Sequence, residues 1–316
     1  MQRIACLFPG QGSQYVGMGS ELYETYPIIR EVFDKAEQLT GIPLTRLCFK
    51  GPVEELNLTS ISQPAIFVLS LACYRFVKSK IQNFIPDAVA GLSLGEFSAL
   101  CAADAISFDE ALGLVKARGE YMDMACRERP GKMASILGLD WKSVEALCKE
   151  IEHEYIVGVA NVNNPSQIVI SGEPNGIQKL IEMAKSKGAK KAIELRVQGA
   201  FHSPLMESAK QKLSAYIQSV HIVTPKIPFF SNVSGSSLSD PEQIRRALID
   251  QVTGSVLWVS DVQGMLELGI NCTLELGCGK VLTGFQRKIA PETVTLNIED
   301  KKSFEYTMSQ LSSLSS

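Results

Sequence analysis

Short apolar segments alternate with longer helical patterns along most of the chain, and this alternation limits the fold more than any other feature. Strands that alternate with helices are typical of α/β domains with a mainly parallel sheet. The apolar runs at 4–8 and 88–90 are predicted strands. Helical spacing of apolar residues predicts helices at 20–39, 64–80, 96–103 and 108–126.

Residues 129–197 follow a different order of elements. The predicted strands are 133–139, 156–162, 167–171 and 192–197, and the predicted helices are 144–153 and 176–187. This β-α-β-β-α-β order is that of a ferredoxin-like unit. The α/β pattern then resumes with a helix at 203–219 and a strand at 227–230. We therefore predict an α/β fold: an α/β-hydrolase-like catalytic domain with a parallel sheet (1–128 and 198–316) and an inserted ferredoxin-like (βαββαβ) subdomain (129–197).

The charge balance and the ends of the chain narrow the class of protein. The 316 residues include 31 Lys and Arg against 34 Asp and Glu, a net charge of −3, so nothing predicts a nucleic-acid partner. No basic segment followed by an apolar run opens the chain, as a secretory signal would. The apolar stretch 61–74 is too short to span a bilayer. We expect a soluble cytoplasmic protein without membrane contact.

Cysteine and histidine usage argues against a metal site. The eight cysteines include no C-x-x-C pair, and only three histidines are present. We interpret the cysteines as reduced core residues and expect Cys278, in a Gly-Cys-Gly loop, to be the exposed one. No metal or cofactor is predicted.

The segment Gly91-Leu92-Ser93-Leu94-Gly95 matches the G-x-S-x-G pattern of a nucleophile elbow. In such an elbow a strand turns sharply into a helix, and the two glycines let the backbone pass closely. Ser93 then lies at a helix N-terminus, where backbone N–H groups favour negative charge. The alternative is an ordinary Gly-Ser turn. The preceding apolar strand and the following helix favour the nucleophile.

A serine nucleophile needs a base, and histidine is the usual one. His153 lies between two glutamates and is predicted to be solvated, and His221 in an apolar run is predicted to be packed. His202 lies in a small-residue loop between a strand and a helix, which favours it as the base. Glu275, or else a carbonyl or amide group, would orient the ring.

Two further features surround these residues in the predicted site. The loop Gly10-Gln11-Gly12 lacks the Lys-Ser/Thr of a phosphate-binding loop. It would instead expose the Gln11 N–H, which with the Leu94 N–H would form an oxyanion hole. Arg118 is read from its neighbours as a surface residue, unless the substrate carries a carboxylate that a guanidinium grips.

The ordered motifs of the chain resemble those of malonyl-CoA:acyl-carrier-protein transacylases of the fatty-acid type, a family close to the free-standing acyltransferases of polyketide synthases. The resemblance covers about residues 4–300 and rests on several motifs in the right order. They are Phe8-Pro9-Gly10-Gln11-Gly12-Ser13-Gln14, Gly91-Leu92-Ser93-Leu94-Gly95-Glu96, Lys116-Ala117-Arg118-Gly119, Asn161-Val162-Asn163, Gln167-Ile168-Val169-Ile170-Ser171-Gly172, Ala200-Phe201-His202-Ser203 and Gly277-Cys278-Gly279-Lys280-Val281-Leu282.

The resemblance implies a role for each matched residue. Ser93 would be the nucleophile and His202 the base, while the Gln11 and Leu94 N–H groups would form the oxyanion hole. Arg118 would bind the malonyl carboxylate, with Met122 and Phe201 also binding substrate. Gln251 would orient the histidine, and Leu94 and Phe201 match members selective for malonyl. Leu92 stands where many members have His, which predicts changed packing or entry. Cys278 replaces a common Pro.

The implied reaction moves malonyl from malonyl-CoA to the phosphopantetheine thiol of acyl carrier protein through a malonyl-serine, supplying fatty acid synthesis. The partners are those two substrates, and we expect a monomer. The alternatives are a trans-acting malonyl transferase of a polyketide synthase, an acyl hydrolase that would not need Arg118, and a non-enzymatic carrier-binding module. The basic run 185–191 is either a docking surface for an acidic carrier protein or a solvated helix end.

Overall fold

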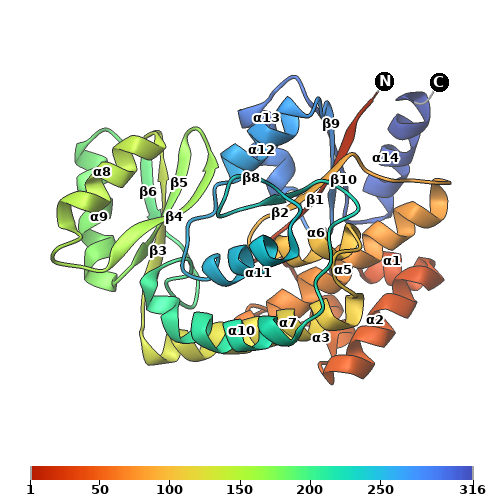
Figure 1. Ribbon diagram of the computed structural model, residues 1–316, viewed down its shortest axis with the longest axis horizontal. Coiled ribbons are helices and arrows are strands. Elements are labelled where there is room, and N and C mark those ends of the chain that lie inside the picture. Colours follow the sequence, from red (N-terminus) through yellow and green to blue (C-terminus); the bar gives the residue numbers. More distant parts are fainter. Residues whose placement is uncertain (1, 315–316) are drawn as a thin grey trace.

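The computed structural model describes residues 2–314, whose strands form two separate β-sheets (Figure 1). The larger sheet has the order β10-β9-β1-β2-β7-β8. Its strands are β1 (Ile4–Phe8), β2 (Ala88–Gly91), β7 (Phe229–Ser231), β8 (Ser236–Leu238), β9 (Cys272–Leu276) and β10 (Val294–Ile298). All neighbours from β10 to β7 pair in parallel, and β8 is antiparallel to β7. The predicted mainly parallel sheet is confirmed.

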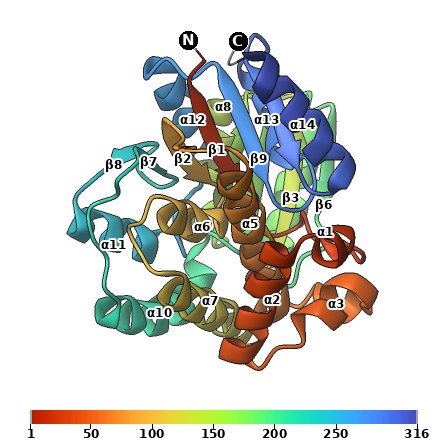
Figure 2. The same cartoon turned by 90° about the vertical axis from the view of Figure 1, so that its right-hand side faces the viewer.

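Helices cover both faces of this sheet (Figure 2). The helices of this larger part of the molecule, some of which pack on other helices rather than on the sheet, are α1 (Ser20–Thr25), α2 (Pro27–Thr40), α3 (Leu44–Lys50), α4 (Val53–Leu56), α5 (Thr59–Lys80), α6 (Gly95–Ala102), α7 (Phe108–Glu128), α10 (Glu207–Ser219), α11 (Pro241–Asp250), α12 (Trp258–Glu267), α13 (Val281–Ile289) and α14 (Lys301–Leu314), with a 3-10 turn at Pro204–Met206. Side chains of a strand alternate between faces. Cys6 and Phe8 of β1 therefore join the core with α5, whereas Ala5 and Leu7 join Trp258 of α12.

The long helix α5 runs through the main core. It begins at Thr59, five residues before the predicted start, and holds Pro64 inside the helix. The sequence predicts that the apolar stretch 61–74 is too short to span a bilayer. The whole helix α5 is longer than this stretch, and by length and composition alone it could cross a membrane. However, 83% of its apolar window is buried inside the protein, as in the core helix of a soluble protein.

Two local features differ from the sequence prediction. The predicted helix at 20–39 is two helices, α1 and α2, which are separated by Tyr26 in an extended conformation. The residue before a proline is pushed out of the helical region, and Pro27 follows directly. The short helices α3 and α4 were not predicted.

The smaller sheet is antiparallel, with the order β4-β5-β3-β6. Its strands are β3 (Lys132–Leu137), β4 (Val157–Asn164), β5 (Gln167–Gly172) and β6 (Lys191–Glu194), and its helices are α8 (Trp141–Ile151) and α9 (Pro174–Ser186). This confirms the predicted ferredoxin-like unit, while its boundaries at 129 and 197 stay a prediction. Ala134 and Ile136 pack toward α8 and α9. The alternate residues Met133 and Ser135 face a pocket between the two sheets.

The cysteines are free thiols, and one expectation about them is wrong. Cys278 is fully buried, and its Sγ lies 3.1 Å from the Ser13 Oγ. The half-buried cysteine is Cys101. Cys278 is covered because the loop that carries it packs closely against Pro9, at the end of β1.

Candidate active site

Ser93 lies at the sharp turn between β2 and α6, with a positive φ of 53°. The flanking glycines permit the close contacts of this turn. A Cβ on Gly91 would lie 1.9 Å from the Gly95 carbonyl carbon, and a Cβ on Gly95 would lie 2.1 Å from the Phe8 oxygen. The backbone N–H of Ser93 donates to the Asn232 Oδ1 at 2.6 Å. The G-x-S-x-G spacing therefore forms the elbow that the sequence predicts.

His202 lies against Ser93, with 2.9 Å between its Nε2 and the serine Oγ. Its Nδ1 lies 2.8 Å from the Gln251 carbonyl oxygen and 3.1 Å from that of Gly254. Because carbonyl oxygens only accept, Nδ1 carries the proton and Nε2 accepts the serine hydroxyl. Burial, and then the charge of Arg118, lower the pKa of His202 to about 4. The ring is therefore neutral at pH 7 and able to take a proton.

The other candidates for base and orienting group lie elsewhere. His153 is exposed, as predicted. His221 is also exposed rather than packed, because residues 221–226 form no strand and its N–H is bonded to Glu110 on α7. Glu275 accepts from the backbone N–H groups of Leu282 and Thr283 at the start of α13. A backbone carbonyl of Gln251, and not a carboxylate, therefore contacts the imidazole.

Arg118 on α7 is buried, with only 1% of its surface exposed, so the reading of a surface arginine is wrong. One terminal nitrogen, Nη1, donates to the Gln63 Oε1 at 2.8 Å. The other, Nη2, donates at 2.9 Å both to the Ser93 Oγ and to the Gln251 Oε1. Burial lowers the pKa of Arg118 to about 10, against the attraction of the Glu96 carboxylate, and the group stays charged at pH 7.

Backbone donors also lie near the serine. Among residues 2–314, the N–H groups of Gln11 and Leu94 donate to no protein acceptor. Leu94 directly follows Ser93 at the start of α6, and Gln11 lies in the loop after β1 that lines the pocket. Unpaired N–H groups beside a nucleophile have the chemistry of an oxyanion hole.

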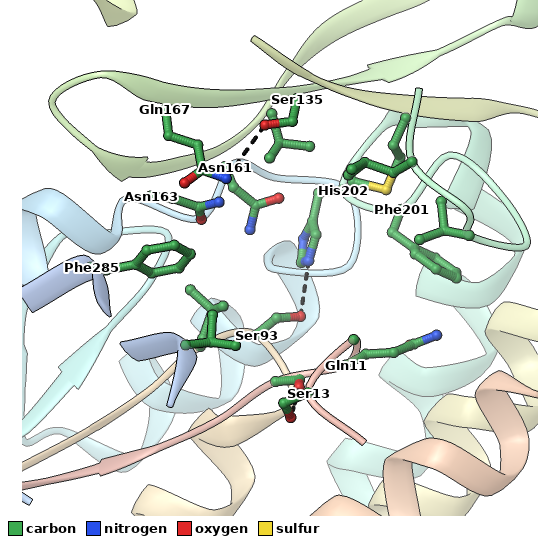
Figure 3. Close-up of a pocket in the computed structure, with 18 of the residues that line it drawn as sticks. Gln11, Ser13, Ser93, Ser135, Asn161, Asn163, Gln167, Phe201, His202 and Phe285 are labelled. Atoms are coloured by element: carbon green, nitrogen blue, oxygen red, sulfur yellow. Dashed lines mark hydrogen bonds between the residues drawn. The ribbon is translucent and has the colours of Figure 1, made fainter. Parts of the chain in front are cut away.

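These groups open into a pocket of about 330 Å³ between the two sheets. Met122 and Phe201, the remaining predicted substrate-binding residues, line it. Asn161, Asn163 and Gln167, here called the amide wall, come from β4 and β5 and lie across the pocket from Ser93 (Figure 3). The Asn163 Oδ1 is buried without a partner among the described residues. Sequence reasoning assigned no function to this wall, although two of the quoted motifs contain it.

A second set of groups that sequence reasoning missed lies behind the serine. Glu96, Asn232 and Asp261 are fully buried and joined by hydrogen bonds. Burial, and then the charge of Glu96, raise the pKa of Asp261 well above its usual value. The position of Glu96 just after the elbow is the one sequence signal for this set.

Known proteins are similar to this chain in both sequence and fold. Residues 6–259 match the model of the acyl transferase domain. The chain is 40% identical over 312 residues to the malonyl CoA-acyl carrier protein transacylase of Bacillus subtilis, covering 98% of each protein. It superimposes with a TM-score of 0.94 on the acyl-carrier-protein-S-malonyltransferase of Bartonella henselae, which is 38% identical, over 98% of this chain and 100% of that one. A type II polyketide synthase acyl-carrier protein in complex with its malonyl-transacylase also matches, with a TM-score of 0.92, 37% identity and coverage of 96% and 97%.

The fold, the elbow and the domain match define an acyltransferase. At 40% identity over nearly its whole length, the chain belongs to the malonyl CoA-acyl carrier protein transacylase family.

Proposed function

We propose that the protein transfers the malonyl group from malonyl-CoA to the phosphopantetheine thiol of an acyl carrier protein, supplying fatty acid synthesis. One observation carries the proposal: the Ser93 Oγ lies 2.9 Å from both the His202 Nε2 and the Arg118 Nη2. A nucleophile thus meets its base and a buried cation in one pocket. The base would take the serine proton during acyl transfer, and the cation would bind a substrate that carries a carboxylate.

The first half of the reaction acylates the serine. His202 takes the Ser93 hydroxyl proton as the Oγ attacks the thioester carbon of malonyl-CoA. The oxyanion is held by the N–H groups of Gln11 and Leu94, and each such donor contributes about 3–4 kcal/mol. The carbon–sulfur bond then breaks, and the CoA sulfur leaves with the proton from His202. The product is a malonyl ester of Ser93.

The second half reverses these steps with a new thiol. The carrier-protein thiol gives its proton to His202 and attacks the ester carbon, and the Ser93 Oγ leaves and regains the proton. Arg118 holds the distal carboxylate throughout, because a buried guanidinium binds a carboxylate through two parallel hydrogen bonds. Met122 and Phe201 bound the acyl group. The Gln251 carbonyl keeps His202 in the required tautomer.

The amide wall is evidence in favour of substrates that carry a pantetheine arm. Both malonyl-CoA and the carrier protein present this arm, whose two amide groups need hydrogen-bond partners once they leave water. Asn161, Asn163 and Gln167 offer donors and acceptors across from the serine. We place the two amides of the arm against this wall.

Mass spectrometry of the intact protein tests the function. Incubation with malonyl-CoA is expected to add one malonyl group, which leaves on addition of phosphopantetheinylated acyl carrier protein and is found on the carrier. If the protein gains no malonyl group, the proposed nucleophilic mechanism is wrong. If free malonate forms instead of malonyl-carrier, the protein is an acyl hydrolase.

A polyketide role is the second candidate, because a 37% identical relative is solved in complex with a polyketide carrier protein. Rates of transfer to a fatty-acid carrier protein and a polyketide carrier protein separate the two. We also propose a monomer, since one chain supplies every group of the site. Its molar mass in solution tests the monomer. We propose a cytoplasmic location as well, because all eight cysteines are free thiols.

A further inference from the structure

Glu96 is a fully buried carboxylate that the mechanism above does not use. It lies in the first turn of α6, three residues after Ser93. Its Oε1 accepts the backbone N–H of Asn232 at 2.8 Å, and its Oε2 accepts a hydrogen bond from the Gln251 Nε2. Burying a carboxylate is costly, so its two bonds indicate a defined task.

Both partners of Glu96 reach the reactive groups. Asn232 accepts the Ser93 N–H at 2.6 Å and donates to the Gly91 carbonyl at 2.9 Å, so it holds the elbow at its first residue and at the serine itself. The Gln251 side chain donates from Nε2 to the Ser93 carbonyl at 2.9 Å and accepts from Arg118 through Oε1 at 2.9 Å. Glu96 is thus one hydrogen bond away from groups that hold Ser93 and Arg118.

The orientation of the Gln251 amide depends on the chemistry at its two ends. A carboxylate is an acceptor only and a guanidinium is a donor only. With Glu96 on one side and Arg118 on the other, the amide therefore has one favourable orientation. If the amide turned over, its NH₂ would face the N–H groups of Arg118 and its oxygen would face the Glu96 carboxylate, so both bonds would be lost.

We propose that Glu96 is a positioning residue whose carboxylate fixes the Gln251 amide and, through it, the direction in which Arg118 meets the carboxylate of the substrate. This inference rests on the proposed function, because it concerns selectivity for malonyl over an acyl group without a carboxylate. The His202 bond is unaffected in this scheme, since it uses the Gln251 backbone carbonyl.

The groups around Glu96 determine its pKa, and therefore the pH below which Glu96 no longer fixes the Gln251 amide. Burial raises the pKa of Glu96 to about 7, against the bonds from Asn232 and Gln251 and the attraction of Arg118 on α7. The other titratable group facing it is Asp261 on α12, which reaches Asn232. Above pH 7 the carboxylate is charged. As the pH falls through 7, a protonated Glu96 loses its attraction for Arg118 and its preference for one amide orientation.

The ratio of acylation rates with malonyl-CoA and acetyl-CoA tests this in the unmodified protein. Single-turnover kcat/KM values for Ser93 acylation are measured by mass spectrometry from pH 5.5 to 8.5. Phosphate groups of CoA titrate near pH 6, but both thioesters carry them, so their effect cancels in the ratio. A malonyl carboxylate with an ordinary pKa near 4 stays charged throughout. The malonyl-to-acetyl ratio is expected to fall as the pH drops through 7.

Variants separate positioning from packing. Glu96→Gln keeps the shape and removes the charge, and we expect the ratio at pH 8 to fall roughly 10- to 100-fold, the effect of losing a hydrogen bond to a charged group. It should also become independent of pH near 7. Glu96→Asp keeps the charge and should retain part of both the ratio and its pH dependence. The control is Glu275→Gln, a second buried carboxylate whose pKa burial raises to about 7 and which caps α13 instead.

The outcomes are distinct. A ratio that is constant with pH in the unmodified protein, or unchanged in Glu96→Gln, overturns the inference while leaving malonyl transfer intact. An equal fall in Glu275→Gln would show that losing any buried carboxylate lowers the ratio, which also overturns it. If malonyl-CoA never acylates Ser93, the proposed function fails first. Should Glu96→Gln not fold, the pH dependence of the unmodified protein decides.

Discussion

Ser93 and His202 both hold a positive φ, of 53° and 58°, although neither is glycine. Such backbone conformations are costly for ordinary residues and persist where the surrounding structure enforces them, often at functional sites. At Ser93 the enforcing contacts are the Asn232 side chain and the glycines of the elbow. At His202 they include two carbonyl oxygens on the imidazole. The side chains of Ser93 and His202 are thus held against each other by the fold itself.

At this scale, Ser93→Ala removes the proposed nucleophile. The variant is expected to gain no malonyl group from malonyl-CoA, because no other hydroxyl lies against the His202 Nε2 among the described residues. Its circular dichroism spectrum should match that of the unmodified protein, since the side chain is small. Malonylation that persists at full rate would exclude Ser93.

Arg118→Ala removes the buried cation. We expect kcat/KM for malonyl-CoA to fall about 30-fold or more, the effect of truncating one partner of a buried charge pair. Acetyl-CoA, which has no distal carboxylate, should lose much less. Arg118→Lys keeps the charge without the planar fork and should be intermediate. Equal losses for both thioesters would contradict a role in carboxylate binding.

At the scale of elements, the elbow and the smaller sheet were predictable for a local reason. Apolar alternation and glycine spacing are encoded in neighbouring residues, and they predicted β1, β2 and the βαββαβ order. The break at Tyr26 between α1 and α2 has a local cause in Pro27, the first residue of α2, but the apolar spacing continues across it and predicts one helix. Helices α3 and α4 are too short to show the helical period of apolar residues, so the sequence pattern did not predict them.

Gly91→Ala tests the elbow as an element. The new Cβ would lie 1.9 Å from the Gly95 carbonyl carbon, closer than the backbone can accept. We expect a fall in melting temperature together with a loss of acylation, because β2 and α6 must separate. Gly158→Ala is the control, since nothing lies within 4 Å of that position. A Gly91→Ala protein with normal stability and rate would contradict the close contact.

At the scale of the whole molecule, the pocket is lined by residues from Gly10 to Phe285, which is why local patterns misjudged some of its groups. The burial of Arg118 depends on Gln63, Ser93 and Gln251, each far away in the chain, and only the family resemblance indicated its role. His221 shows the opposite error: its apolar neighbours predicted packing, but the tertiary fold leaves it at the surface.

The basic run 185–191 connects the end of α9 with β6 on the smaller sheet, and its docking role stays a prediction. Replacing the exposed Lys187 and Lys191 with Glu should raise KM for an acidic carrier protein severalfold and should reduce or reverse the rise of KM with salt, because the screened attraction is lost. Acylation by malonyl-CoA should not change. The matched control replaces Lys142 and Lys149 on α8 with Glu. An equal effect of both pairs would place docking elsewhere.

The pocket around the proposed nucleophile also determines the order in which the two substrates react. In the proposed mechanism the CoA thioester and the carrier thiol reach Ser93 through the same space between the two sheets, so they bind one after the other and not together. Released CoA therefore competes with the incoming carrier for the acylated protein. The cellular ratio of free CoA to carrier then decides whether each captured acyl unit moves forward or returns to its donor.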